Sequence, residues 1–160
     1  MITTILTFII SILLESVFSN LFKNILFLFA ISLIVVSSKY IEKKYFFIIC
    51  IFGIISSLIF SPSLFLYGIS YLLIAYLSKL LINKNSSFIE EIIIYILLSY
   101  LHVVVIFIFT LGNYNSGYIY LTNLFFNSLP INIFYYLILY LIYYAIYGRI
   151  SNRLKKRTYK

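Results

Sequence analysis

The sequence is poor in the residues that most catalytic and metal-binding sites require. Its 160 residues include four glutamates, one histidine and no aspartate. So few carboxylates and imidazoles leave little material for a metal site or for a pair of catalytic carboxylates. A Gly-rich phosphate loop and a Gly-x-Ser-x-Gly elbow are also missing from the sequence. We therefore expect no enzyme activity, no cofactor and no metal site.

Charged residues are scarce as well, and apolar residues take their place. Charged residues make up 10% of the chain and hydrophobic residues 64%, whereas about a quarter of an ordinary soluble domain is charged. The mean hydropathy is +1.10, and a water-soluble core could not bury this much apolar surface. The lone cysteine, Cys50, lies in an apolar run, where we expect it to face lipid or another helix. The composition predicts an all-α integral membrane protein that sits in a lipid bilayer.

Charges and turn-forming residues divide the chain into six apolar segments, each of which is a candidate membrane-spanning helix. We expect these segments at about residues 2–18, 24–38, 45–60, 64–81, 89–111 and 130–148. The second segment is marginal for a full crossing, and a re-entrant second segment would change the count. Residues 113–127 are polar enough to be a loop, in which residues 118–126 can form a short interfacial or re-entrant piece.

Basic residues gather on one side of this arrangement. With six crossings, all twelve Lys and Arg residues except Lys23 fall on the same side as the two termini. The breaks at residues 61–63 and 113–127, which fall on the other side, contain no basic residue. By the positive-inside rule, both termini of this multi-pass protein are then cytoplasmic. We expect one transmembrane bundle, residues 1–148, and a basic cytoplasmic tail, residues 149–160, which fixes the topology, contacts anionic lipid and does not bind nucleic acid.

Glu15 is the charged residue of the first predicted span. A carboxylate inside a membrane span costs a few kcal/mol on insertion scales and is often functional. Glu15 lies near the outer end of its span, however, where it can also reach the interface, pair with Lys23 or remain protonated. Both a functional and a structural role therefore remain open.

A polar stripe follows one face of the fifth predicted span. Three- and four-residue spacing brings five residues to the same side of an ideal helix: Glu91, Tyr95, Ser99, His102 and Thr110. Such a stripe either forms hydrogen bonds between helices or lines a path for a small substrate or a proton, because histidine titrates near neutral pH. At the start of this span, Glu90 and Glu91 occupy the first turn, where the helix dipole favours acids.

The order of features resembles that of a bacterial membrane-protein family. The likeness is carried by LLESVF at residues 13–18, FGIISSLIFSPSL at 52–64, the Gly and Tyr residues of 68–76, LPIN at 129–132 and the basic close at 148–157. In these features the chain resembles the rod shape-determining protein MreD family, whose members have about this length, about six hydrophobic segments and a short basic tail. The frequent aspartate of the family is absent, and Ser56 or Ser57 stands near its place.

This resemblance implies a non-enzymatic scaffold in the cytoplasmic (inner) membrane of rod-shaped bacteria. Such a scaffold belongs to the cell-wall elongation complex, binds the single-span protein MreC and helps couple the filament protein MreB to peptidoglycan synthases. No small-molecule substrate is then expected. Packing against the helix of an MreC-like partner would use residues that permit close approach: Gly53, Ser56, Ser57, Gly68 and Ser70.

A rival interpretation is the substrate-binding membrane subunit of an energy-coupling-factor vitamin transporter, which also has about six helices. Such a subunit should offer a polar outer pocket and an Ala-x-x-x-Ala-like motif on its first helix. The first segment lacks that motif, since Ser11 is followed four residues later by Glu15. A membrane-embedded enzyme acting on lipid is a third class, disfavoured by the shortage of acidic and histidine ligands.

Overall fold

The computed structural model describes residues 2–22, 24–40, 45–60, 65–83, 86–111 and 115–158. Over these ranges helices are the only regular secondary structure, without a strand, as the composition predicts. The helices are α1 (Ile2–Leu21), α2 (Phe29–Ser38), α3 (Tyr45–Phe60), α4 (Leu66–Leu81), α5 (Phe88–Leu111) and α6 (Asn115–Thr158).

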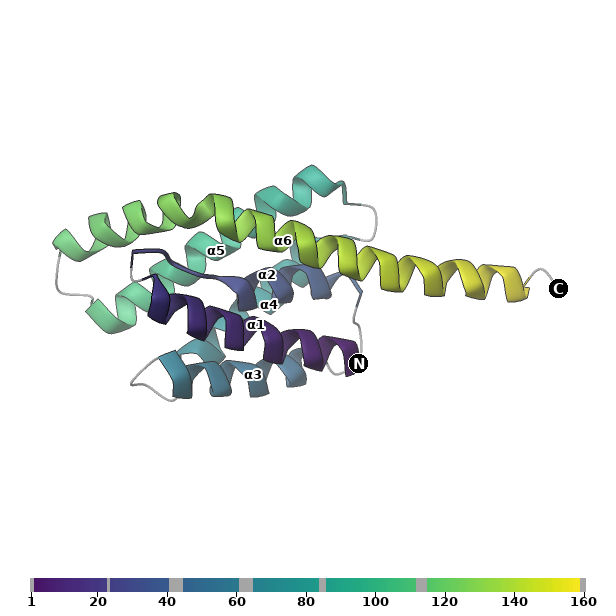
Figure 1. The fold of residues 1–160 in the computed structure, drawn as a ribbon, viewed down its shortest axis with the longest axis horizontal. Helices are drawn as coiled ribbons and strands as arrows, with labels where there is room; N and C mark the ends of the chain where they lie inside the picture. The colour runs from purple at the N-terminus through teal and green to yellow at the C-terminus, as the bar shows by residue number, and fades with distance from the viewer. Residues whose placement is uncertain are drawn as a thin grey trace.

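The helices lie along the long axis of the molecule and alternate in direction, so that the two termini lie at the same end (Figure 1). α2 occupies the centre of the bundle: it contacts α1, α4, α5 and α6, and all ten of its residues are buried. α6 is the longest helix, with 44 residues, and its C-terminal part extends beyond the other helices (Figure 1).

Among the described residues, three helices are long and apolar enough to cross a membrane, judged by length and composition. They are α1 over Thr4–Leu21, α5 over Phe88–Phe109 and α6 over Ile119–Tyr147. The helices α2, α3 and α4 are also apolar but have 10, 16 and 16 residues, fewer than the roughly 20 of a typical spanning helix.

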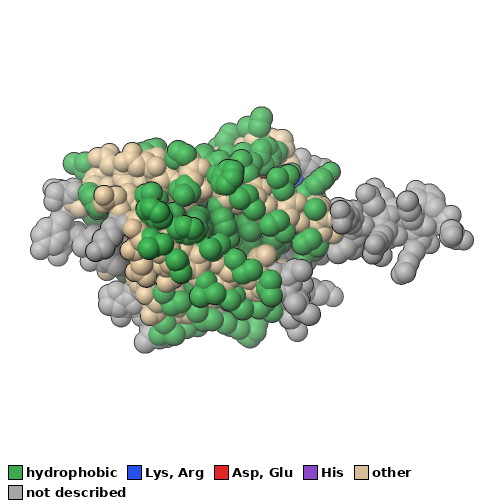
Figure 2. Space-filling view, in the orientation of Figure 1, with side chains coloured by type: hydrophobic (Ala, Val, Ile, Leu, Met, Phe, Trp, Pro, Cys, Tyr) green, Lys and Arg blue, Asp and Glu red, His purple; other side chains and the backbone are tan. Residues whose placement is uncertain are grey.

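The surface of the molecule has the character of a membrane protein. Large apolar side chains point outwards on several helices, for example Leu13 (58% exposed), Phe47 (66%) and Phe134 (63%). Hydrophobic side chains are spread over the visible face in Figure 2. Soluble monomers rarely expose apolar patches on this scale, whereas lipid tails cover them at no cost.

The prediction of a loop at residues 113–127 is wrong, because α6 begins at Asn115 and continues through Pro130. The polar residues of this stretch are compatible with a helix: Asn123 and Asn127 are four residues apart and both exposed. Proline is tolerated inside membrane helices when neighbouring groups satisfy the freed backbone. The expected helix start at Pro130 is therefore an interior position.

Several other predicted features are only partly covered by the described residues. The break at residues 61–63 and the basic residues Lys23, Lys43, Lys44 and Lys84 lie outside them. In the predicted tail, α6 continues as a helix to Thr158. The predicted second span, residues 24–38, is helical only from Phe29 onwards.

Candidate functional site

The interior of the bundle contains a stretch of non-helical chain. Residues 24–28 precede α2, and Phe27 and Leu28 are each 2% exposed. Backbone N–H and C=O groups buried in this way need protein partners, since neither lipid nor an apolar core can supply them. The N-cap residue Leu28 offers no side-chain hydrogen bond, so the partners must come from other helices.

Asn132 on α6 supplies part of this bonding. Its Oδ1 accepts a hydrogen bond from the backbone N–H of Leu28 (2.9 Å), and its Nδ2 donates to the carbonyl of Leu26 (2.7 Å). The same Nδ2 also donates to the carbonyl of Ser128 (3.0 Å) on its own helix. Asn132 is 1% exposed, so one buried amide holds the non-helical segment against α6.

Glu15 on α1 supplies another part. Its Oε2 accepts a hydrogen bond from the backbone N–H of Ala30 (3.0 Å), and the residue is only 5% exposed. Ala30 lies in the first turn of α2, where N–H groups have no partner within the helix and the dipole favours a negative charge. Glu15 therefore acts as a cap for α2 that comes from a neighbouring helix.

A cavity of about 100 Å³ lies beside this cap. Its polar lining consists of Glu15, Ser19, Tyr67 and His102. Its apolar lining consists of Leu26, Phe27, Leu28, Phe60, Val103, Ile106 and Leu121. These residues come from the later parts of α1, α3 and α5, the segment before α2, and the early parts of α4 and α6. The cavity therefore lies in the half of the bundle that is distant from the two termini.

His102 is held firmly at the edge of this cavity. It is 3% exposed, and its Nδ1 is 2.7 Å from the hydroxyl oxygen of Ser70 on α4. The rings of Tyr67 and Tyr71 pack against the imidazole, with centroid distances of 5.4 and 5.6 Å. Because Ser70 occupies Nδ1, Nε2 is the ring nitrogen that remains for another partner.

The structure thus brings Glu15 and His102, two of the predicted intramembrane polar residues, to one cavity. No basic side chain among the described residues forms a salt bridge with Glu15. Within the same part of the chain, no group of three or more His, Cys, Asp or Glu residues is arranged to hold a metal ion. The lining can offer a ligand one carboxylate, one imidazole, hydroxyl groups and aromatic rings.

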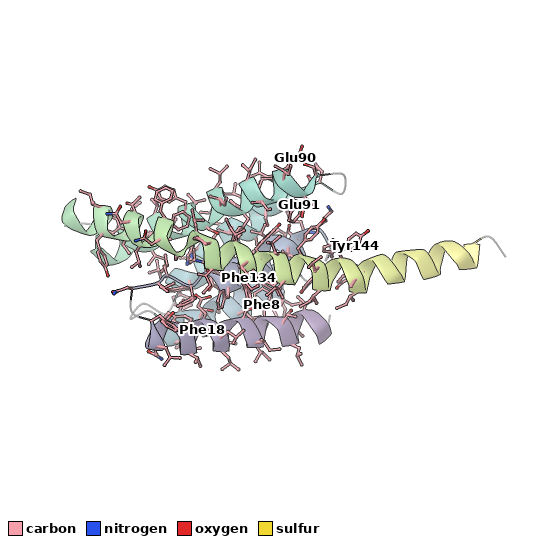
Figure 3. All side chains as sticks on the ribbon, turned by 45° about the horizontal axis from the view of Figure 1, so that its top comes forward. Phe8, Phe18, Glu90, Glu91, Phe134 and Tyr144 are labelled. Atoms are coloured by element: carbon pink, nitrogen blue, oxygen red, sulfur yellow. The ribbon has the colours of Figure 1, made fainter. Side chains whose placement is uncertain are left out.

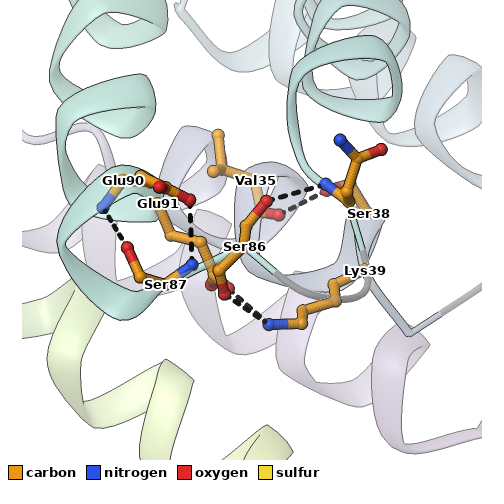
Figure 4. A network of polar contacts seen from close by, with 8 residues as sticks. Val35, Ser38, Lys39, Ser86, Ser87, Glu90 and Glu91 are labelled. Atoms are coloured by element: carbon orange, nitrogen blue, oxygen red, sulfur yellow. Dashed lines mark hydrogen bonds and ion pairs between the residues drawn. The ribbon is translucent and has the colours of Figure 1, made fainter.

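Glu91 lies at the other end of the bundle. Its Oε1 is 2.5 Å from Nζ of Lys39, which also donates to the carbonyl of Ser86 (3.4 Å; Figure 4). Beside this pair, Ser87 and Glu90 bond each other's backbone N–H groups (3.3 and 2.9 Å), which is a capping box at the start of α5. The prediction that acids occupy the first turn of this helix is confirmed.

Figure 3 shows the separation of the two ends, with Glu90, Glu91 and Tyr144 near one end and Phe18 at the other. The middle of the predicted stripe bonds to neighbouring helices: the hydroxyl of Tyr95 accepts from Ser32 (2.9 Å) on α2, and the ring stacks on Tyr136 of α6.

Ser99 and Thr110 are further members of the stripe. Ser99 is buried (1% exposed), and the side chain of Thr110 lies outside the described residues.

The small residues predicted to pack against a partner are all buried within the chain. A Cβ added to Gly53 would lie 2.6 Å from Cα of Gly68, so α3 and α4 approach most closely there. Ser57 accepts a hydrogen bond from the backbone N–H of Tyr67 (2.9 Å), and Ser70 contacts His102. Gly53, Ser56, Ser57, Gly68 and Ser70 thus take part in internal packing. A role for them in partner binding stays a prediction.

Sequence reasoning did not single out Asn132 for a structural role. The available signal is an amide in an apolar stretch, two residues after Pro130, the residue at which the sequence predicts a helix start. No protein-family model, curated protein or solved structure matches this chain.

Proposed function

We propose that the protein crosses the bacterial cytoplasmic membrane six times, with both termini in the cytoplasm. The alternating helix directions support this topology (Figure 1). So does the charge distribution: the described basic residues Lys39 and Lys79 follow α2 and end α4, at the end of the bundle where the termini lie. The described residues of the opposite end contain no Lys or Arg.

The short second helix is compatible with six crossings. Its 10 residues rise about 15 Å, and the five residues of non-helical chain before it can span at most about 16 Å. Together they can reach across a hydrocarbon core of about 30 Å. Asn132 satisfies backbone groups of the non-helical part and Glu15 an N–H of the first turn of α2, which is the condition for irregular backbone at membrane depth.

Within this membrane we infer a role as a non-enzymatic scaffold of the cell-wall elongation complex, required for rod shape. The resemblance to the MreD family supports this role, and its partner would be an MreC-like single-span protein that links to cell-wall synthases. The structural observation that carries the proposal is an apolar stripe on α1. Leu6, Ile10, Leu13 and Val17 are 57%, 44%, 58% and 53% exposed and alternate by four and three residues, the spacing of a helix–helix seam.

Detergent-resistant co-purification from the native membrane tests the scaffold role. We expect the tagged protein to recover a single-span protein with a periplasmic coiled coil and cell-wall synthases, and its depletion to round the cells. A cysteine crosslinker at Leu13→Cys, in a Cys50→Ala background, should capture the single-span partner. The matched control Ile93→Cys, 53% exposed on α5, should not. Equal capture from both positions would argue against the α1 stripe.

The cavity favours a second candidate, the substrate-binding membrane subunit of an energy-coupling-factor transporter. Its few polar groups among apolar and aromatic walls are the kind of lining that orients a small substrate. In the proposed topology it lies in the outer half of the membrane, where such a subunit receives its substrate. Recovery of a second multi-pass protein together with paired ATPases in the same co-purification would support this candidate and contradict the scaffold.

A further inference from the structure

We propose that the cavity beside Glu15 and His102 binds a small organic cation, namely an amine carried on a flat apolar body. The inference depends on neither proposed role, because a scaffold can be regulated by such a ligand and a transporter subunit can deliver it. It goes beyond the expectation, drawn from the family resemblance, that the protein has no small-molecule substrate.

The charge of the ligand follows from Glu15. Its Oε2 accepts the Ala30 N–H, and the start of α2 contributes the equivalent of about half a positive charge. A carboxyl group that is 5% exposed keeps its proton unless a cation lies beside it, since an unpaired buried charge is costly. An ammonium group in the cavity would supply the missing charge and donate to the carboxylate.

A second polar contact comes from His102. With its proton on Nδ1, the imidazole donates to Ser70, and Nε2 becomes an acceptor. An ammonium group carries three N–H donors, so it can serve Glu15 and His102 together. The hydroxyl of Ser19, which also lines the cavity, is a further acceptor.

The shape of the rest of the ligand follows from the other walls. Phe27, Phe60 and Tyr67 line the cavity with aromatic rings. Rings of this kind attract a cation at their faces and stack against flat groups. Aliphatic side chains, among them Val103 and Ile106, complete the wall. An alkylamine that carries an aromatic ring therefore matches the lining better than a sugar or a polar amino acid.

Three probes that share one ring test the inference: benzylamine, benzyl alcohol and benzoate. Binding to the purified full-length protein in detergent micelles is measured by calorimetry at pH 7, with empty micelles as the blank. We expect benzylamine to bind at least tenfold more tightly than benzyl alcohol and to raise the thermal unfolding midpoint, and benzoate not to bind. Equal binding of the alcohol, or tighter binding of benzoate, would overturn the proposal.

Four variants locate the site. Glu15→Gln keeps an acceptor for Ala30 but loses the charge, so benzylamine should bind at least tenfold more weakly. Glu90→Gln, at the opposite end of the bundle, should leave binding unchanged. Val103→Phe fills the cavity and should abolish binding. Lys23→Gln removes the basic residue that follows α1 in the sequence and should not weaken binding.

Unchanged benzylamine binding in Glu15→Gln or in Val103→Phe would contradict the site. Monodisperse gel filtration and unchanged helicity show whether each variant is folded. If Glu15→Gln fails this check, Val103→Phe decides the outcome, because its change leaves the cap of α2 in place. Co-purification of the single-span partner is read independently, so failure of the ligand site is distinguishable from failure of the scaffold role.

Discussion

At Asn132, one amide side chain bonds three backbone groups, two of which belong to the non-helical chain before α2. A hydrogen bond between membrane helices contributes only about 0.6 kcal/mol on average. A buried donor or acceptor that loses its partner costs about 1–3 kcal/mol. The importance of Asn132 therefore lies in the groups that its removal would leave unsatisfied.

We expect Asn132→Leu to lower the free energy of unfolding by about 2–4 kcal/mol, because the Leu28 N–H and the Leu26 carbonyl would lose this partner inside the bundle. Unfolding by SDS in mixed micelles measures the change. Asn127→Leu on the same helix is the matched control: its side chain is exposed, and its effect should stay within about 0.5 kcal/mol. Equal effects of the two changes would contradict the role of Asn132 in holding the non-helical segment before α2.

Single residues were predictable where they conflicted with their surroundings. Glu15 and His102 stand out in apolar segments, and both line the cavity. Asn132 gave no such contrast, because it lies two residues after Pro130, a residue that is itself typical of a helix start. The partner of Glu15 was not predictable either, since a backbone N–H of α2 has no sequence signature and depends on where that helix begins.

At the scale of elements, α3 and α4 form the closest helix pair. An alanine at Gly53 would place its Cβ 2.6 Å from Cα of Gly68, which is backbone and cannot move aside. An alanine at Gly68 would meet its nearest atom at 3.8 Å, an ordinary contact. Two glycines that face each other thus have unequal tolerance to the same change.

We expect Gly53→Ala to destabilise the protein by about 1–3 kcal/mol, as overpacking does, and Gly68→Ala to change its stability by less than about 0.5 kcal/mol. Thermal unfolding of the two variants, followed by circular dichroism in the same detergent, gives the comparison. If Gly68→Ala destabilised the protein more than Gly53→Ala does, the expected difference between the two glycines would be contradicted.

The elements were predictable where hydrophobicity and charge agree. Residues 45–60 match α3 in full, and the predicted starts of α4 and α5 differ from the observed ones by two residues and one residue. The start of α6 was missed by 15 residues, because Asn residues on an exposed face lower the mean hydropathy without breaking the helix. The late start of α2 depends on Asn132 and Glu15 of other helices, so no local pattern could give it.

At the scale of the whole molecule, the two ends differ in chemistry. The end that contains the termini has the Lys39–Glu91 ion pair, in which the side chains are 15% and 2% exposed. This pair joins the end of α2 to the start of α5. The other end has the cavity and no described basic residue.

We expect Lys39→Met to destabilise the protein by about 3 kcal/mol, since it leaves the buried carboxylate of Glu91 without its partner. The double variant Lys39→Met with Glu91→Gln removes the charge as well and should recover part of the loss. SDS unfolding of the two single variants and the double variant gives the coupling energy. A double variant with additive losses would show that the two residues act independently.

The topology is tested by cysteine labelling in a Cys50→Ala background. Phe65→Cys, at an N-cap that is 63% exposed, should react with an impermeant maleimide added to intact cells or spheroplasts. Ser86→Cys should react only after the membrane is opened, because we place it on the cytoplasmic side. Labelling of both positions from the same side would exclude six crossings.

The bond between Leu28 and Asn132 joins residues 104 positions apart in the chain. At a synthesis rate of about 5–20 residues per second, the ribosome needs roughly 5–20 s to make the residues between them. During that time the non-helical segment cannot enter lipid with its backbone satisfied. Biogenesis should therefore be late and cooperative: the insertion machinery must shelter the segment until the last helix emerges, and nascent chains that stop before Asn132 should be substrates for membrane proteases.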